Sequence, residues 1–268
     1  MDRIFSEVRL PLDCRITPVK EKERVRVYRI VSRDETYFLK TETNGDMQRE
    51  GDMLSFLHAR CMGAQVVRGG SSWLLTRALP GVGGAELAAE DPARTAFLFG
   101  RAVRRLHELD IRECPVKNPA HVMMEQARRR YLERQADAGL LQYVGCADMD
   151  AAFREMEALW ERHRPMDDAV IHGDCCLPNL IACGDLAGWI DCGYGGVGPR
   201  HYDLFWAQWS VRFNCKSRDA VDAFRAAYGE TEIDDALVRL FGLISCFNGY
   251  RGRDIYDPAE IPVQEEYL

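Results

Sequence analysis

The chain lacks the features that would place it in a membrane or outside the cell. It has 268 residues, no apolar run long enough to span a bilayer, and an N-terminus, MDRIFSEVRL, without the apolar core of a signal peptide. We therefore expect a soluble, cytoplasmic protein with no membrane partner. The length and the 47% of hydrophobic residues suffice to bury the core of one large domain or of two lobes.

The cysteines lack the spacing of a zinc site or a disulfide framework. Ten are present, spread from Cys14 to Cys246, and no two form a CxxC pair. Most lie beside apolar residues, which favours reduced cysteines in the core. Positive charge is in deficit as well. The net charge of −7 argues against nucleic acid as a partner and is compatible with a cationic small molecule. We interpret the run 128–130, three arginines, as a solvated helix face.

The candidate functional side chains gather around one short loop. An apolar strand at 169–171 breaks at His172-Gly173-Asp174, and a proline then leads to Asn179 on the same loop. A hairpin is expected next, with Gly184-Asp185 as its turn, and its second strand ends at Asp191. Because a hairpin folds back on itself, we expect Asp191 to return to the level at which the loop began.

Two carboxylates and an amide oxygen on one loop suit a hard cation such as Mg²⁺ and leave the other carboxylate to orient a hydroxyl. That set of groups is typical of phosphoryl transfer. In this interpretation Asp174 accepts the proton of the substrate, while Asn179 and Asp191 hold Mg²⁺ on the phosphates of ATP or GTP. The alternative is a plain β-turn and a strand-ending cap, which explains either fragment alone but not both together.

The N-terminal part supplies a candidate ion pair. Strands are expected at 24–31 and 36–40, followed by a helix at 46–60. Glu50 shares the apolar face of that helix, and a carboxylate turned toward a core needs a cationic partner. Lys40, at the end of the second strand, is the candidate, and such a pair holds the α- and β-phosphates in kinases. An exposed edge lysine is the alternative.

From Gly83 onward the pattern is mainly helical. Asp91-Pro92 predicts a helix start, and Asp148 is a candidate cap for another helix. The expected helices cover 92–107, 148–160, 201–213, 217–228 and 234–247. For His107, at the end of the first of them, we favour a packing role over a functional one.

Three motifs resemble one family. His172-Gly173-Asp174, Leu177-Pro178-Asn179 and Gly188-Trp189-Ile190-Asp191-Cys192-Gly193 are similar to the signature of the aminoglycoside 3'-phosphotransferases. The likeness continues at Gly196-Val197 and Tyr202-Asp203-Leu204 and fades after about residue 213. The resemblance implies an α+β, two-lobed, protein-kinase-like fold. A small β-rich N-lobe at 1–77 would bind the nucleotide, 78–82 would be the hinge, and 83–268 would form a larger, mainly helical C-lobe.

The resemblance also implies an activity, the ATP-dependent phosphorylation of a small-molecule hydroxyl. The best substrate is the 3'-hydroxyl of an aminoglycoside antibiotic, so that the enzyme would confer resistance. Two alternatives stay open: a kinase for another small alcohol or amino sugar, and a catalytically silent relative that binds nucleotide. The second is suggested by the charged segment 19–23, where kinases have a glycine-rich loop, and by Tyr194, where the family commonly has an arginine.

By the same resemblance, further residues acquire roles. The main chain of Arg77 and Leu79 would contact adenine, unless this segment is an ordinary turn. Asp203 would brace the catalytic loop through backbone N–H groups, and His172 is assigned a supporting role beside it.

The substrate side of the chain departs from the family. The insert acids Asp148, Asp150, Glu155 and Glu157 are candidates to hold amino sugars, or they form an ordinary polar helix face. The acidic pair that the family has in its last helix is missing, because the matching residues are Ile244-Ser245-Cys246-Phe247-Asn248. The tail acids Glu265 and Glu266 would offer carboxylates if the tail folds back.

Overall fold

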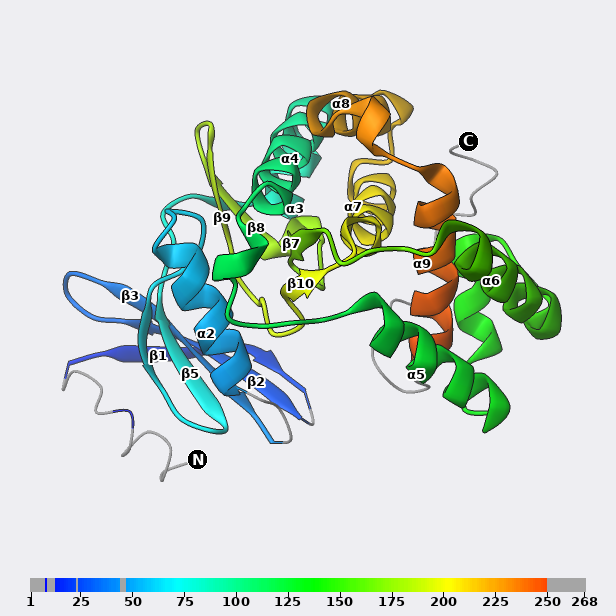
Figure 1. Cartoon of the computed structure of the whole chain (residues 1–268). Coiled ribbons are helices and arrows are strands. Elements are labelled where there is room, and N and C mark those ends of the chain that lie inside the picture. The colour runs from blue at the N-terminus through cyan, green and yellow to red at the C-terminus, as the bar shows by residue number, and fades with distance from the viewer. Residues whose placement is uncertain (1–7, 9–12, 23, 44–46, 250–268) are drawn as a thin grey trace. The chain divides into compact units, whose positions relative to one another are not determined.

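A computed structural model describes residues 8, 13–22, 24–43 and 47–249 (Figure 1). Within this part the chain forms two compact units. The first contains the residues up to Val82 together with 181–194, and the second contains 83–180 and the residues from Gly195 onward. Glu265 and Glu266 lie outside the described residues. No described helix has the length and apolar character that crossing a membrane requires.

The first unit is built on an antiparallel sheet with the strand order β1-β2-β3-β5-β4 (Figure 1). The strands are β1 (Arg15–Glu21), β2 (Val25–Val31), β3 (Thr36–Glu42), β4 (Val66–Gly69) and β5 (Trp73–Arg77). Successive side chains of a strand point to opposite faces, so one face of the sheet carries Leu39 and Leu75 and the other carries Lys40 and Leu74. The first pair packs in a buried cluster with Val8. Helix α2 (Met47–His58) lies on the second face, where a methyl group added to Gly51 would lie 3.3 Å from Leu74.

A hairpin from the middle of the chain completes this unit. Its strands are β8 (Leu180–Cys183) and β9 (Leu186–Trp189), and β6 (Val82–Gly83) pairs with β8. Trp189 N–H donates to the Met62 carbonyl at 2.8 Å, and its own carbonyl accepts from Ala64 N–H at 3.3 Å. These long-range hydrogen bonds are why 181–194 belongs with the N-terminal unit, whereas the sequence prediction put all of 83–268 in one lobe.

The second unit is mainly helical. Its helices are α3 (Gly84–Glu90), α4 (Pro92–His107), α5 (Ala120–Leu132), α6 (Met149–His163), α7 (Arg200–Cys215), α8 (Arg218–Tyr228) and α9 (Asp235–Asn248). Two short strands, β7 (Ala169–Ile171) and β10 (Gly196–Gly198), pair with each other. Side-chain caps explain several helix starts: Asp91, Asp148, Ser217 and Asp234 each accept backbone N–H groups of the following turn.

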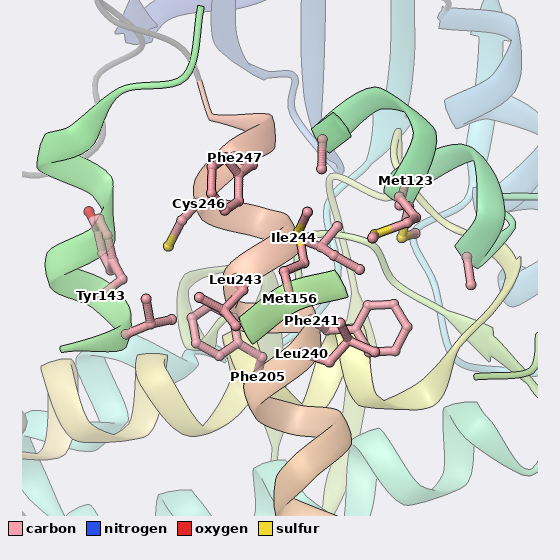
Figure 2. Packing of buried hydrophobic residues seen from close by; sticks show 14 of the residues in the cluster. Met123, Tyr143, Met156, Phe205, Leu240, Phe241, Leu243, Ile244, Cys246 and Phe247 are labelled. Carbon is pink, nitrogen blue, oxygen red and sulfur yellow. The ribbon is translucent and has the colours of Figure 1, made fainter. Parts of the chain in front are cut away.

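Helix α9 contributes to a buried hydrophobic cluster of the second unit, together with α5, α6 and α7. Figure 2 shows its Leu240, Leu243, Ile244 and Phe247 beside residues of other segments, such as Met156 of α6. Burying a side chain of this size stabilises the fold by roughly 1.5–3 kcal/mol, so these four contribute on the order of 8 kcal/mol. Helix α9 therefore has a structural role in this cluster.

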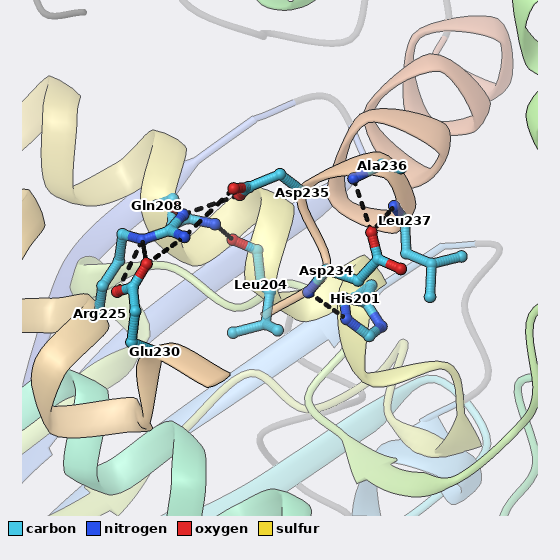
Figure 3. Close-up of polar contacts among 9 residues, drawn as sticks. All are labelled: His201, Leu204, Gln208, Arg225, Glu230, Asp234, Asp235, Ala236 and Leu237. Carbon is cyan, nitrogen blue, oxygen red and sulfur yellow. Dashed lines mark hydrogen bonds and ion pairs between the residues drawn. The ribbon is translucent and has the colours of Figure 1, made fainter. Parts of the chain in front are cut away.

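Polar contacts fix both ends of α9. At its start, the Arg225 guanidinium bonds Glu230, Asp235 and the Gln208 side chain, as Figure 3 shows. At its end, Arg130 Nη1 donates to the Asn248 carbonyl at 2.5 Å, one of the terminal carbonyls that a helix leaves without an internal partner. The prediction of a solvated face for 128–130 is wrong for Arg130, which is buried, because its guanidinium satisfies these carbonyls.

Candidate active site

The loop that follows β7 is held by one buried carboxylate. Gly173 has φ of 80°, a left-handed conformation that favours glycine, and it turns the chain between His172 and Asp174. Asp203, in the first turn of α7, accepts the His172 N–H at 2.6 Å and the Gly173 N–H at 2.9 Å. His172 Nδ1 accepts the Asp174 N–H at 3.2 Å. Asp174 is thus presented by a turn whose three backbone N–H groups all have partners.

Asp203 is itself oriented by a chain of hydrogen bonds. Its Oδ2 lies 3.3 Å from His107 Nε2, and His107 Nδ1 lies 2.9 Å from the Tyr228 hydroxyl. A carboxylate can only accept, so Nε2 is the donor to Asp203, while Nδ1 and the Tyr228 hydroxyl share the second hydrogen bond. All three side chains are buried, and burial raises the pKa of Tyr228 well above its ordinary value. His107 is therefore a hydrogen-bond partner of Asp203, in addition to the packing role that was expected for it.

Asn179 and Asp174 lie together, as the sequence predicted for one loop. Asn179 Nδ2 donates to the Asp174 carboxylate and to its carbonyl, both at 2.9 Å. The turn at Leu177–Asn179 is anchored from behind, because the Ser210 hydroxyl of α7 accepts the Leu177 N–H at 2.9 Å. Nothing in the sequence singled out Ser210, since a serine inside a helix gives no local signal of a distant partner.

In the first unit, Lys40 joins the two other predicted carboxylates. Its Nζ lies 2.7 Å from Glu50 Oε2 and also donates to Asp191 Oδ1. Burial lowers the pKa of Lys40, but the two carboxylates outweigh that effect and leave the pKa raised, so the side chain is an ammonium ion. Burial raises the pKa of the Glu50 carboxyl against the pull of Lys40. The pair that the helix pattern predicted is present, with Asp191 as a second acceptor.

The hinge residues also lie in the first unit. The Arg77 N–H is used within the sheet, where it donates to the Gln65 carbonyl at 2.9 Å. The Leu79 side chain packs against β9, since a methyl group on Gly188 would lie 2.8 Å from it.

The donor set suits Mg²⁺ better than a transition metal. Asn179 and Asp191 offer an amide and a carboxylate oxygen, which are hard ligands. Within the described residues no three His, Cys, Asp or Glu side chains form a metal cluster. Mg²⁺ commonly binds to one or two protein oxygens, with waters and substrate phosphates completing its shell. Asn179 in the second unit and Asp191 in the first are each of a type that this ion takes.

Comparison with known proteins identifies the family. A model of the phosphotransferase enzyme family matches residues 15–241. The chain belongs to this family. A probable aminoglycoside 3'-phosphotransferase of Lactococcus lactis is 25% identical over 223 residues, which are 81% of this chain and 84% of that protein. An aminoglycoside 3'-phosphotransferase of Niallia circulans is 30% identical over 177 residues, 65% of this chain and 66% of that protein.

A solved structure agrees with this assignment. The crystal structure of an aminoglycoside-3'-phosphotransferase of type VIII is 25% identical and has a TM-score of 0.76, covering 92% of this chain and 98% of that one. The family that the motifs indicated and the kinase-like α+β fold are thus confirmed.

The acidic insert of this phosphotransferase is engaged within the protein. Asp148 caps α6, and Asp150 accepts the Tyr131 hydroxyl at 2.7 Å. Glu155 pairs with Arg239 and Glu157 with Arg128, each through two hydrogen bonds of 2.7–2.9 Å. Hydrogen bonds from Arg239 lower the pKa of Glu155. A carboxylate that already binds a guanidinium attracts a further ammonium group less strongly, so this insert is a weaker cation site than its sequence indicated.

Proposed function

We propose that this phosphotransferase transfers the terminal phosphoryl group of ATP or GTP to the 3'-hydroxyl of an aminoglycoside antibiotic, and so confers resistance. The observation that carries the proposal is the braced loop, in which Asp203 holds the two N–H groups before Asp174 and Asn179 bonds the Asp174 carboxylate. The names of the relatives support the same reaction. The cytoplasm, which contains the nucleotide, is the proposed location.

In the proposed reaction the substrate oxygen attacks the terminal phosphorus of the nucleotide. The bond between that phosphorus and the β-phosphate oxygen breaks, and the nucleoside diphosphate leaves. Asp174 takes the proton of that hydroxyl, and the Asn179 amide keeps the accepting carboxylate in place. The Lys40 ammonium, fixed by Glu50, binds the α- and β-phosphates. Asn179 and Asp191 would hold Mg²⁺, which when bound neutralises charge on the phosphates.

The main chain of the hinge is proposed to bind adenine. The Arg77 carbonyl accepts from the amino group of the ring, and the Leu79 N–H donates to a ring nitrogen. Because the Arg77 N–H already donates to the Gln65 carbonyl, we assign the acceptor to the Arg77 carbonyl and the donor to Leu79.

Asp174→Asn tests the role of the base. The substitution keeps the size of the side chain and removes its affinity for a proton, so turnover should fall by roughly 10² to 10⁴-fold while nucleotide affinity stays the same. The control is Asp185→Asn, an equal change at the exposed hairpin turn. Turnover is followed by a coupled assay of nucleotide consumption with kanamycin-type aminoglycosides. An Asp174→Asn enzyme with wild-type turnover would remove Asp174 from the chemistry.

A second candidate acceptor is a small amino alcohol or amino sugar. The observation that favours it is the scarcity of available acids: the four insert carboxylates have partners, and the end of α9 reads Ile244-Ser245-Cys246-Phe247-Asn248 without an acid. A polycationic antibiotic needs several carboxylates, each charge-assisted contact contributing about 1.5–3 kcal/mol. A panel of aminoglycosides, neutral sugars and amino alcohols separates the two acceptors, and turnover of none of them would favour a silent nucleotide-binding relative.

A further inference from the structure

The turn that carries Asp191 is attached to the α2 segment on both sides. Before the turn, Trp189 exchanges main-chain hydrogen bonds with Met62 and Ala64, which follow the end of α2. After the turn, Arg49 in the first turn of α2 donates from Nε to the Gly193 carbonyl at 3.1 Å. Both attachments lie within the first unit. The position of the turn is therefore set by one helix and the residues that follow it.

The turn needs such attachment because its backbone is strained. Asp191 has φ of 60°, in the left-handed region that non-glycine residues seldom adopt. Without an outside restraint, the residue would relax toward an ordinary conformation and its carboxylate would move. The turn also packs tightly on the helix, since a methyl group on Gly193 would lie 3.2 Å from Glu50 Oε2.

Two neighbouring residues of α2, Arg49 and Glu50, hold different parts of the Asp191 turn. Glu50 holds Lys40, which in turn donates to the Asp191 side chain. Arg49 holds the main chain two residues further on, through a charged donor on a neutral carbonyl. The side chain of Asp191 and the backbone that follows it are thus held by the same turn of α2 through different contacts. Of these contacts, the sequence predicted only the pair of Lys40 and Glu50.

We propose that Arg49 is a positioning residue for Asp191. By fixing the Gly193 carbonyl, it keeps the backbone of the turn in the left-handed conformation that sets the position of the Asp191 carboxylate, which would hold the metal. The role proposed for Arg49 is indirect, because it acts through the Gly193 carbonyl. The inference rests on the proposed role of Asp191 in holding Mg²⁺.

The test measures nucleotide binding and does not depend on the acceptor substrate. A non-hydrolysable ATP analogue is titrated into the full-length protein by calorimetry, with and without Mg²⁺. Arg49→Met keeps the apolar stem and removes the donor, so it should weaken binding in the presence of Mg²⁺ by roughly tenfold and leave binding without Mg²⁺ unchanged. Arg49→Lys, which keeps a charged donor, should lie between Arg49→Met and wild type.

Gln48→Met is the matched control. It lies in the same helical turn, is exposed, and donates to Asp52 at 2.8 Å within α2, away from the Asp191 turn. Its two affinities should equal those of wild type. A melting curve without ligand identifies any variant that fails to fold.

The outcomes separate this inference from the proposed function. A wild-type protein whose nucleotide affinity does not respond to Mg²⁺ would overturn the metal role of Asp191 and the inference with it. A wild-type response that Arg49→Met retains in full would overturn the inference alone. A fall in affinity of Arg49→Met that is equal with and without Mg²⁺ would mean a general structural role, and would also overturn it.

Discussion

The strongest structural prediction concerns Asp203, the buried carboxylate that binds the loop at His172 and Gly173. It accepts from three donors, His172 N–H at 2.6 Å, Gly173 N–H at 2.9 Å and His107 Nε2 at 3.3 Å. Asp203→Asn has nearly the same size, but one of its two accepting oxygens becomes an NH₂ group. At least one of the three donors then faces another donor in a site closed to water.

The magnitude follows from these contacts. A buried N–H left without an acceptor costs about 1–3 kcal/mol. The bonds that remain go to a neutral oxygen in place of an ionised one and lose about half of their strength, or on the order of 1 kcal/mol each. If the amide nitrogen faces Gly173, one donor is lost and two bonds are weakened. The expected loss of unfolding free energy is therefore about 3–5 kcal/mol, which is large for a substitution that removes no atom.

Urea denaturation followed by tryptophan fluorescence measures this loss, because Trp206 and Trp209 lie on the same helix, α7, as Asp203. The control is Asp234→Asn. Asp234 also accepts two backbone N–H groups, at the start of α9, but its side chain is 47% exposed and asparagine caps a helix equally well. The control should change stability by less than about 0.5 kcal/mol. A loss below about 1 kcal/mol for Asp203→Asn would refute the reasoning.

Two further predictions concern charge. Lys40→Met and Glu50→Gln should each weaken nucleotide binding, because removing one partner leaves the other unpaired in a buried site. The double variant should be little worse than either single variant. Additive losses in nucleotide affinity would contradict the pairing. Burial lowers the pKa of His201 from 6.5 to about 4, and its Nε2 accepts the Asp234 N–H at 3.2 Å (Figure 3), which requires the neutral ring. Since the unfolded chain binds the proton at higher pH than the folded one, stability should fall by up to about 3 kcal/mol as pH drops from 6.5 to 4. The unfolding free energy is measured by urea denaturation at several pH values in that range. It should depend less on pH in His201→Gln than in wild type, and an equal dependence in both would argue against the buried neutral histidine.

Local signals in the sequence predicted most of the elements. Asp91 followed by a proline, and Asp148 ahead of an apolar stripe, gave helix starts that match α4 and α6. Gly184 has φ of 61°, as expected for the hairpin turn that it predicted. The pairing of Lys40 with Glu50 was accessible for a similar reason, since a carboxylate on an apolar helix face has to find a cation.

The contacts that the sequence did not predict are long-range and leave no periodic trace. Strand β1 is exposed along its whole length, and its register shifts after Pro18, so no alternation marks it. In the sequence, Arg130 cannot be told from an exposed helix arginine, because its partner is a main-chain carbonyl at the distant end of α9. Arg49 is similar, because its partner is a backbone carbonyl more than a hundred residues away in sequence. Interactions that follow from the chemical type of a side chain can be predicted from the sequence. Contacts with a main-chain group far away in the sequence can be known only from the folded structure.

The hairpin that joins the first unit has a consequence for synthesis of the chain. A ribosome delivers the N-terminal sheet and α2 first, then all of residues 83–180, and only afterwards the segment that pairs with Met62 and Ala64. At about 5–20 residues per second, the nascent sheet waits for several seconds with Lys40 and Glu50 in place and Asp191 still unmade. The first unit is thus finished by a segment that is made about a hundred residues after the rest of it, and a chain that stops before residue 181 carries a first unit that cannot be completed.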